Sequence, residues 1–284
     1  MIKVNGLYHS YTNNEQCAVK DLNFEVKKGE IFGFLGPSGA GKSTTQNILT
    51  GLLQLQKGEV SIAGEDVRKQ SQKLFNAMGV SFEHPNVYKK LTGLENLNFY
   101  KSMFAVPTED PEKLLEMVGL REAMNKKASE YSKGMLQRLV FARSMINNPQ
   151  VWFLDEPTSG LDPTTASAIK EIIRQKQKAG STIFLTTHNM YIAEELCDRV
   201  AFINEGIIQA IDSPRNLKLQ HGERLVHVEY QDSGQLKKET LSMVLQQDQE
   251  RIASLIQGGA VDTMHSQEAT LEQIFIKLTG RGLE

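Results

Sequence analysis

Cysteine is almost absent from this chain, which has only Cys17 and Cys197 among 284 residues. Two single cysteines without paired spacing exclude a disulfide framework and a cysteine-based zinc site, and they suit a reducing compartment. Charge of one sign is not in excess either, because 32 Lys and Arg stand against 34 Asp and Glu. This near-neutral balance, with no basic stripe, gives no electrostatic case for nucleic acid as a partner.

Long apolar runs are also missing. No stretch approaches the roughly 18 consecutive apolar residues that a membrane-spanning helix needs, and residues 1–6 lack the apolar core of a secretory signal. We therefore expect a cytoplasmic chain. If the protein works at a membrane, it would lie peripherally on the inner face, and another chain would span the bilayer.

Strand-like and helix-like segments alternate from about residue 30 to about residue 212, which predicts an α/β fold with a mostly parallel sheet covered by helices. The apolar runs at 151–154 and 182–185 are typical of buried central strands. The first thirty residues predict a separate antiparallel layer. Residues 92–148 predict a helical subdomain inserted between two strands of the sheet.

The pattern changes near residue 213. Beyond a short helix, we expect one strand at 225–230, a polar segment rich in Gln and Asp, and a final helix from residue 269. This arrangement predicts two domains, a larger one over residues 1–220 and a small accessory α/β domain over residues 221–284.

The most informative stretch is a complete match to the phosphate-loop pattern G-x-x-x-x-G-K-[ST], set between an apolar strand and a predicted helix. Its glycines let the backbone curl so that N–H groups form an anion site at the positive end of the helix. Lys42 would reach the terminal phosphates of a nucleotide, and the Ser43 hydroxyl would bind Mg²⁺. The nucleotide-binding residues expected here are Gly36, Pro37, Ser38, Gly39, Ala40, Gly41, Lys42, Ser43 and Thr44.

Two carboxylates follow the apolar strand at 151–154, namely Asp155 and Glu156. Asp155 is expected to hold Mg²⁺ through water. Glu156 is then expected to polarise the attacking water as a general base.

With these motifs in this order, residues 1 to about 212 resemble the nucleotide-binding subunit of ATP-binding cassette (ABC) transporters. The resemblance implies a P-loop NTPase fold of the RecA type, with ATP and Mg²⁺ as cofactors. Asp155 and Glu156 resemble the magnesium aspartate and catalytic glutamate of the family, and His188 resembles its switch histidine at the γ-phosphate. The family's D-loop is matched by Ser159, Gly160, Leu161 and Asp162.

The resemblance also gives Tyr11 a role, because the family places an aromatic there that stacks on adenine. Two alternatives remain open from the sequence. Tyr8 could take this role, or Tyr11 could be a core aromatic of the antiparallel layer.

The chain departs from the family pattern at two motifs. The signature, usually Leu-Ser-Gly-Gly-Gln, is here carried by Ser132, Lys133, Gly134 and Met135, before a helix expected at 136–145. Ser132 and Gly134 still offer a hydroxyl and a backbone N–H to a phosphate, and the Lys133 side chain is expected in solvent. Glu83 stands where the family commonly has Gln, and its carboxylate could also bind Mg²⁺.

The family resemblance implies partners. Each ATP would be enclosed by the signature of a second cassette, so a homodimer or a paired cassette is expected, together with an integral membrane permease on a separate chain. The segment at 269–282 resembles the end of cassettes from exporters of drugs, antibiotics and polysaccharides. The expected function is therefore ATP hydrolysis that powers an exporter.

Other functions fit the motifs less well. A soluble ABC-type ATPase in assembly, DNA repair or translation is the alternative, although translation-type relatives usually carry two cassettes and repair-type relatives a long coiled coil. A GTPase would need an aspartate after Asn125-Lys126-Lys127, where Ala128 stands. A kinase would not require the signature or the D-loop.

Overall fold

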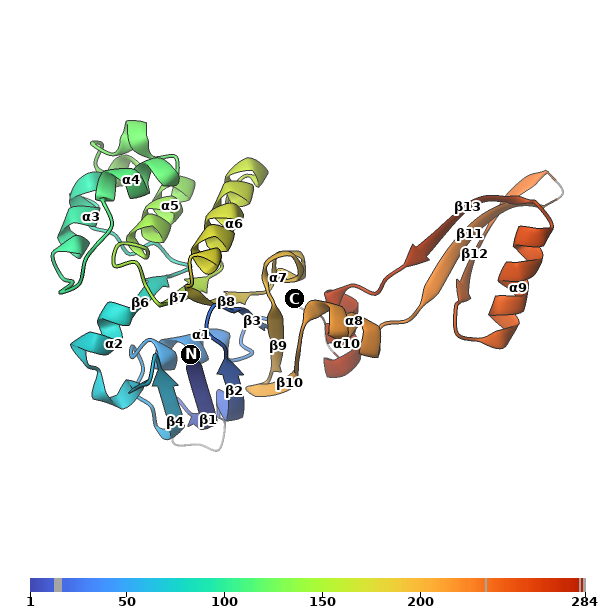
Figure 1. Ribbon diagram of the computed structural model, residues 1–284, viewed down its shortest axis with the longest axis horizontal. Helices are drawn as coiled ribbons and strands as arrows, with labels where there is room; N and C mark the ends of the chain where they lie inside the picture. The colour runs from blue at the N-terminus through green and yellow to red at the C-terminus, as the bar shows by residue number, and fades with distance from the viewer. Residues whose placement is uncertain (13–16, 233, 281, 283–284) are drawn as a thin grey trace. The chain divides into compact units, whose positions relative to one another are not determined.

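The computed structural model describes residues 1–12, 17–232, 234–280 and 282. These residues form two compact units, which divide after Asp212 (Figure 1). The second unit begins at Ser213, so the boundary expected after residue 220 falls inside it. Arg281, within the segment that resembles exporter cassettes, lies outside the described residues.

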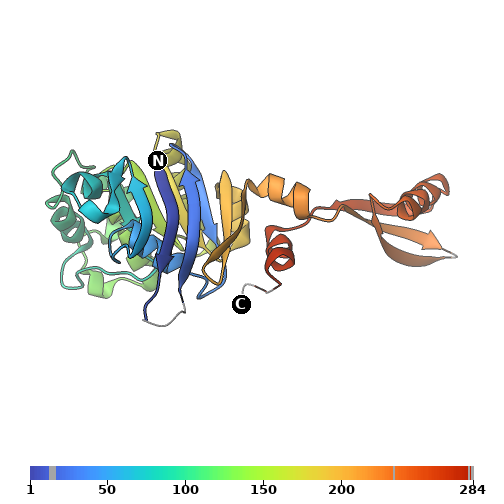
Figure 2. The ribbon, with the colours of Figure 1, turned by 90° about the horizontal axis from the view of Figure 1, so that it is seen from below.

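The first unit contains the antiparallel layer expected from its first thirty residues, extended by two later strands. The strand order in this four-stranded sheet is β2-β1-β4-β5, and its blue to teal strands lie side by side in Figure 2. Buried and exposed residues alternate along β1, because one face of the sheet packs on the core. The four strands are β1 (Ile2–His9), β2 (Val19–Val26), β4 (Lys57–Ile62) and β5 (Glu65–Asp66).

A six-stranded sheet forms the centre of the first unit, in the order β10-β9-β3-β8-β7-β6. Its strands pair in parallel except β9 with β10, which confirms the mostly parallel α/β sheet. The strands are β3 (Ile31–Leu35), β6 (Met78–Ser81), β7 (Val151–Asp155), β8 (Thr182–Thr187), β9 (Arg199–Asn204) and β10 (Ile207–Asp212). The helices that accompany these two sheets are α1 (Lys42–Leu49), α2 (Gln72–Ala77), α6 (Pro163–Lys178) and α7 (Met190–Leu196).

An aromatic cluster joins the two sheets of the first unit. The Phe184 ring lies at the centre of this cluster, with ring centroids 5.5 to 6.1 Å from those of its four neighbours. Each of the five rings is at least nine-tenths buried, so the cluster fixes the core beneath the loops that follow β3, β7 and β8. The neighbours are Phe24 of the antiparallel sheet and Phe32, Phe34 and Phe153 of the central sheet.

The helical subdomain lies between β6 and β7 in the chain, as the sequence predicts. Its three helices stand together at one end of the first unit in Figure 1, away from β1, β2 and β4. The first helix begins with a capping box, in which the Thr92 hydroxyl and the Glu95 carboxylate each accept a backbone N–H. The helices are α3 (Gly93–Lys101), α4 (Pro111–Met117) and α5 (Lys133–Arg143).

The second unit contains more regular structure than the sequence suggests. The Gln- and Asp-rich polar segment, for which no element was expected, forms a second strand and a helix, and a third strand follows. These polar strands are ordered by pairing with the β11 backbone. Their own residues do not predict a strand. The elements are α8 (Pro214–His221), β11 (Leu225–Asp232), β12 (Gln235–Ser242), α9 (Gln246–Gln257), β13 (Val261–Gln267) and α10 (Leu271–Thr279).

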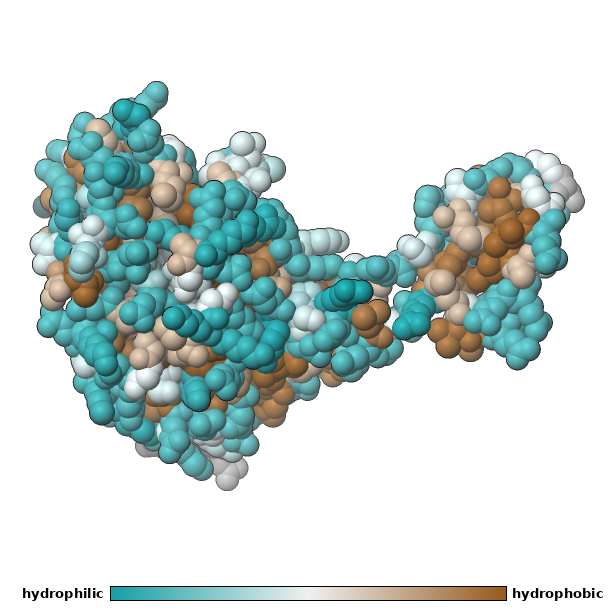
Figure 3. Space-filling view, in the orientation of Figure 1, coloured by the Kyte–Doolittle hydropathy of each residue, from teal (hydrophilic) through white to brown (hydrophobic). Residues whose placement is uncertain are grey.

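The surface is largely hydrophilic on the face shown in Figure 3, with scattered apolar areas. In the part of the chain that the structure describes, no helix has the length and apolar character to cross a bilayer.

Candidate functional site

The phosphate loop joins the buried strand β3 to α1 and leaves no room for side chains at two of its glycines. A Cβ on Gly36 would lie 2.2 Å from the Ile203 carbonyl oxygen, and Gly41 has a φ of 107°. Glycine is therefore required at both positions for steric and conformational reasons. The Lys42 ammonium donates hydrogen bonds to the carbonyls of Gly36 and Pro37, at 2.7 and 2.9 Å.

A cavity of 480 Å³ opens in front of this loop, a size typical of small-ligand sites. The structure brings together here most of the residues expected to bind nucleotide, metal or water. Gly36, Pro37 and Ala40 belong to the loop but do not line the cavity. The lining residues are Tyr11, Ala18, Ser38, Gly39, Gly41, Lys42, Ser43, Thr44, Glu83, Asp155, Glu156 and His188.

Asp155 ends strand β7 at the floor of this cavity. Burial raises the pKa of its carboxyl group, a hydrogen bond from the Thr186 hydroxyl opposes that shift, and the negative charges of Glu83 and Glu156 add to it. Burial also lowers the pKa of Lys42, against the attraction of the three carboxylates. The site thus concentrates charges whose burial is costly without a ligand.

Glu156 follows directly, with a φ of 46° that is uncommon for a residue other than glycine. Its buried carboxylate accepts hydrogen bonds from the Thr187 hydroxyl at 2.8 Å and from the His188 backbone N–H at 2.8 Å. The His188 Nδ1 lies 2.6 Å from Glu156 Oε1. These contacts fix the orientation of the Glu156 carboxylate within the cavity.

Tyr11 lies at the rim of the cavity and is 63% exposed, so the alternative that it is a core aromatic is wrong. Its hydroxyl lies 3.0 Å from the Thr44 hydroxyl, which holds the ring beside the phosphate loop. Tyr8 does not line this cavity, and its ring is covered by the Lys57 ammonium at 4.6 Å. Of the two tyrosines, only Tyr11 lines the cavity in front of the phosphate loop.

The oxygen ligands for a metal are compatible with nucleotide-bound Mg²⁺. Ser43, Glu83 and Asp155 offer hard oxygen atoms to the same cavity. No group of three or more His, Cys, Asp or Glu side chains among the described residues is placed to hold a metal ion by itself. Mg²⁺ in nucleotide sites usually needs only one or two carboxylates in addition to substrate phosphates and water, so this set suits it.

The signature residues do not reach the cavity in front of the phosphate loop. Ser132 caps α5 by accepting the Met135 N–H at 3.3 Å, and the helix begins at Lys133, three residues before the expected start. A Cβ on Gly134 would lie 3.6 Å from the Leu161 side chain, so signature and D-loop pack together. Asp162 in turn caps α6 by accepting the Thr165 N–H at 3.0 Å.

A further cavity of 320 Å³ lies beside the signature. Lys133 lines it and is exposed, as expected from the sequence. The complete lining is Glu83, His84, Pro85, Lys133, Gln137, Ser159 and Gly160.

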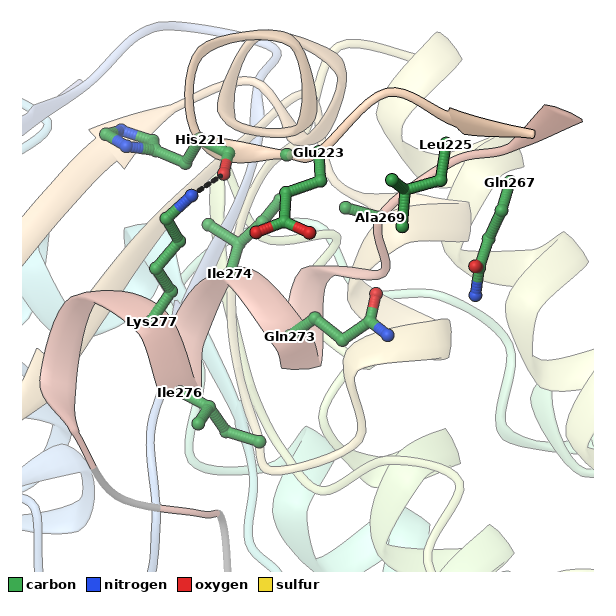
Figure 4. Close-up of a pocket in the computed structure, with 10 residues that line it drawn as sticks. His221, Glu223, Leu225, Gln267, Ala269, Gln273, Ile274, Ile276 and Lys277 are labelled. Atoms are coloured by element: carbon green, nitrogen blue, oxygen red, sulfur yellow. Dashed lines mark hydrogen bonds between the residues drawn. The ribbon is translucent and has the colours of Figure 1, made fainter. Parts of the chain in front are cut away.

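The second unit holds a separate cavity of 360 Å³, between the ends of β11 and β13 and helix α10 (Figure 4). Its polar groups do not suit phosphate. Lys277 donates to the His221 carbonyl at 2.9 Å, Gln273 serves the capping box of α10, and the Glu223 carboxylate would repel an anion. The nucleotide site is therefore assigned to the first unit.

Three residues of the site, Ala18, Gln46 and Thr186, were not expected to belong to it from the sequence. Ala18 lines the cavity opposite Gly41, whose Cβ would lie 2.8 Å from the Ala18 carbonyl oxygen. The Thr186 hydroxyl donates to Asp155 and also lies 3.0 Å from the side-chain oxygen of buried Gln46. For Gln46, the sequence shows only a polar residue in the helix after the phosphate loop. Its burial, which requires a hydrogen-bond partner, is known from the structure.

Known proteins are similar to this chain over most or all of its length. The family model described as ABC transporter matches residues 19–159, and one described as an AAA domain matches residues 125–194. The fluoroquinolones export ATP-binding protein of Mycobacterium tuberculosis is 48% identical over 284 residues, which are 100% of this chain and 94% of that protein. A Nod factor export ATP-binding protein I of Rhizobium etli is 35% identical over 97% of this chain and 92% of its own length.

Solved structures of ABC cassettes are similar to part of this chain. The ATP-binding subunit of an ABC transporter superposes with a TM-score of 0.71 at 27% identity, over 78% of this chain and 92% of its own. A dimeric ATP-binding cassette bound to ADP and phosphate superposes with a TM-score of 0.69 at 27% identity, over 75% of this chain and 98% of its own. The chain therefore belongs to the ATP-binding proteins of the ABC transporter family, a family of ATPases.

Proposed function

We propose that this chain is the ATP-hydrolysing subunit of an ABC exporter and that it powers a permease carried on a separate, membrane-spanning chain. One observation carries the proposal: the similarity to the fluoroquinolones export ATP-binding protein extends through both units, over 100% of this chain. The Nod factor export protein supports the same class, again over nearly the whole length. The cargo we propose is a drug or antibiotic.

The reaction is hydrolysis of ATP to ADP and phosphate. The N–H groups of the phosphate loop and the Lys42 ammonium would bind the β- and γ-phosphates, and the exposed face of Tyr11 would stack on the adenine. Glu156 accepts a proton from water as the water oxygen attacks the γ-phosphorus and the bond to the β-phosphate oxygen breaks. His188, beside Glu156, would orient the γ-phosphate and the water.

Mg²⁺, held by Ser43, Asp155 and Glu83, would neutralise charge on the β- and γ-phosphates. Thr186 fixes the Asp155 carboxylate, and Thr187 together with the His188 backbone fixes Glu156. Both carboxylates would therefore meet the nucleotide already oriented.

A second cassette would complete the site. Ser132, Lys133, Gly134 and Met135 lie outside the cavity of their own chain, which supports a role on the nucleotide of a partner. A similar cassette bound to ADP and phosphate is dimeric, which supports a pair of cassettes. ATP binding would close a homodimer or mixed pair, hydrolysis would open it, and the permease would hold the pair at the inner face of the membrane.

The test is purification of the tagged full chain from detergent-solubilised membranes of its own host. We expect a multi-span protein to co-purify, and we expect cells with Glu156→Gln to accumulate more of a fluorescent fluoroquinolone than cells with the unaltered chain. Glu171→Gln, an exposed change on α6, is the matched control. Recovery of soluble partners alone, with unaltered drug accumulation, would instead support a soluble ABC ATPase.

A further inference from the structure

Residues 83–87 lie between β6 and α3 and form neither a helix nor a strand. Glu83 begins this segment and lines the cavity in front of the phosphate loop, where its charge acts on Lys42 and Asp155. The structure describes all five residues, and the hydrogen bonds that it gives them all go to Asn86. The polar contacts that hold the segment therefore come from a side chain elsewhere in the chain.

Arg143 supplies these contacts from the last position of α5. Its guanidinium donates hydrogen bonds to the backbone carbonyl of Asn86 at 2.6 Å and to the Asn86 side-chain oxygen at 2.5 Å. It also donates to the Tyr100 hydroxyl at 2.9 Å and lies over the Tyr100 ring, 4.3 Å from the centroid. The guanidinium thus links α5 and α3 to the segment that begins with Glu83.

A buried arginine is a costly way to fill this position. Arg143 is 5% exposed, and burial lowers the pKa of its guanidinium. It has no carboxylate partner among the described residues, so oxygens of Asn86 and Tyr100, the Tyr100 ring and the C-terminal end of α5 offset its charge. A guanidinium donates to two oxygens of one residue at once, which a lysine ammonium does less well. The residue type therefore suits a role in holding Asn86.

A second side chain of α5 holds the other side of Glu83. Gln137 is buried in the middle of the helix and donates to the Phe82 carbonyl at 3.4 Å. The contacts of Gln137 and Arg143 therefore flank Glu83 in the chain. Because α5 begins within the signature, one helix carries the signature at its start and holds the proposed Mg²⁺ ligand along its length.

We propose that Arg143 is a positioning residue for the Mg²⁺–nucleotide site. By holding Asn86, it keeps Glu83 facing the cavity that Ser43 and Asp155 also line. Without this contact the segment would adopt other positions, and the apparent affinity for Mg²⁺ would fall with the fraction of chains in which Glu83 faces the cavity. This proposal deepens the proposed function and rests on its Mg²⁺–nucleotide site.

The test measures how much Mg²⁺ the full chain needs to bind nucleotide. A fluorescent, non-hydrolysable ATP analogue is titrated with Mg²⁺ at fixed ionic strength, and the Mg²⁺ concentration at half-maximal binding is measured beside the ligand-free melting temperature. We expect Arg143→Lys to raise this concentration about three- to ten-fold, as for a segment correctly placed in about a third to a tenth of the chains. Arg138→Lys is the matched control on α5 and should stay near wild type, because Arg138 donates to the Val118 and Gly119 carbonyls instead.

Two further variants sharpen the test. Asn86→Ala, an exposed change, removes one of the oxygens that accept from Arg143, so it should shift the Mg²⁺ requirement in the same direction by about two-fold. Glu83→Ala should also raise the requirement. Adding Arg143→Lys to Glu83→Ala should cause no further shift, because the carboxylate that Arg143 positions is gone.

A lower melting temperature in Arg143→Lys with an unchanged Mg²⁺ requirement would show a purely structural residue and overturn the proposal. Equal shifts from Arg143→Lys with and without the Glu83 carboxylate would also overturn it, and the proposed function would stand in both cases. If Arg143→Lys does not fold, the result for Asn86→Ala decides, and an unchanged requirement there counts against the proposal. If wild type shows no Mg²⁺-dependent binding at all, the proposed nucleotide site fails, and this inference fails with it.

Discussion

Asp155 in the first unit and Glu239 in the second are carboxyl groups with opposite pKa shifts. Burial raises the pKa of Asp155, with added repulsion from Glu83 and Glu156. The pKa of Glu239 is lowered to about 2, first by a hydrogen bond from Arg251 and then by one from Tyr230. The ionised Asp155 carboxylate therefore destabilises the folded first unit, whereas the ionised Glu239 carboxylate stabilises the folded second unit.

This difference separates a site built for a ligand from a cluster built for the fold. A buried carboxylate whose pKa is raised persists where binding a cation offsets its cost. The triad of buried Tyr230, Glu239 and Arg251 needs no ligand, because Arg251 and the Tyr230 hydroxyl both donate hydrogen bonds to the Glu239 carboxylate. The chemistry of this chain is therefore expected in the first unit.

The largest expected effect comes from Glu156→Gln. The amide keeps the size of the side chain but cannot accept the proton of the attacking water, so turnover should fall about 10²- to 10⁴-fold. ATP binding should persist, and an ATP-bound dimer should accumulate. Phosphate release and gel filtration with ATP measure these effects. Normal turnover would refute Glu156 as the base.

Phe184→Ala should have the next largest effect, confined to the first unit. It empties the centre of the aromatic cluster, and a buried Phe→Ala change costs about 3–5 kcal/mol. Leu255→Ala in the smaller core of the second unit is the matched truncation. Hydrogen exchange resolved by peptide would show which unit loses protection. If Phe184→Ala weakened protection mainly in the second unit, the two cores would not be independent.

Glu239→Gln should have the smallest effect, and it should depend on pH. Because the pKa is lowered from 4.5 to about 2, the stabilisation is fully present above pH 4.5 and is lost as the pH falls toward 2. Solvent screening limits this stabilisation of the second unit to less than about 1 kcal/mol. Hydrogen exchange of the second unit between pH 3 and 7 measures the difference from wild type, with Glu250→Gln as the control. A difference that grows toward low pH would contradict this assignment.

Much of the first unit could be predicted from the sequence because its elements carry strong local signals. The apolar run at 151–154 lies within β7, and the run at 182–185 lies within β8. The helical subdomain also forms where expected. These segments are buried on both faces or have clear helix caps, so local pattern and tertiary structure agree.

The remaining features depend on contacts that the sequence does not encode locally. Strand β12 reads Gln-Leu-Lys-Lys-Glu-Thr-Leu-Ser, and only its pairing with β11 explains its conformation. In the site, Ala18 contributes through its place in the loop between β1 and β2, and Thr186 through a hydroxyl that reaches a neighbouring strand. Such roles depend on which strands are adjacent.

The central claim, that the first unit keeps the Asp155 charge for a metal–nucleotide ligand, is tested most directly by the melting temperature of Asp155→Asn. Above pH 4, a carboxyl group with a raised pKa destabilises the folded state, because ionisation is easier in the unfolded chain. Without ligand and with a chelator, the variant should therefore melt above wild type. With Mg²⁺ and ADP the order should reverse. A variant that melts below wild type in both conditions would contradict the claim.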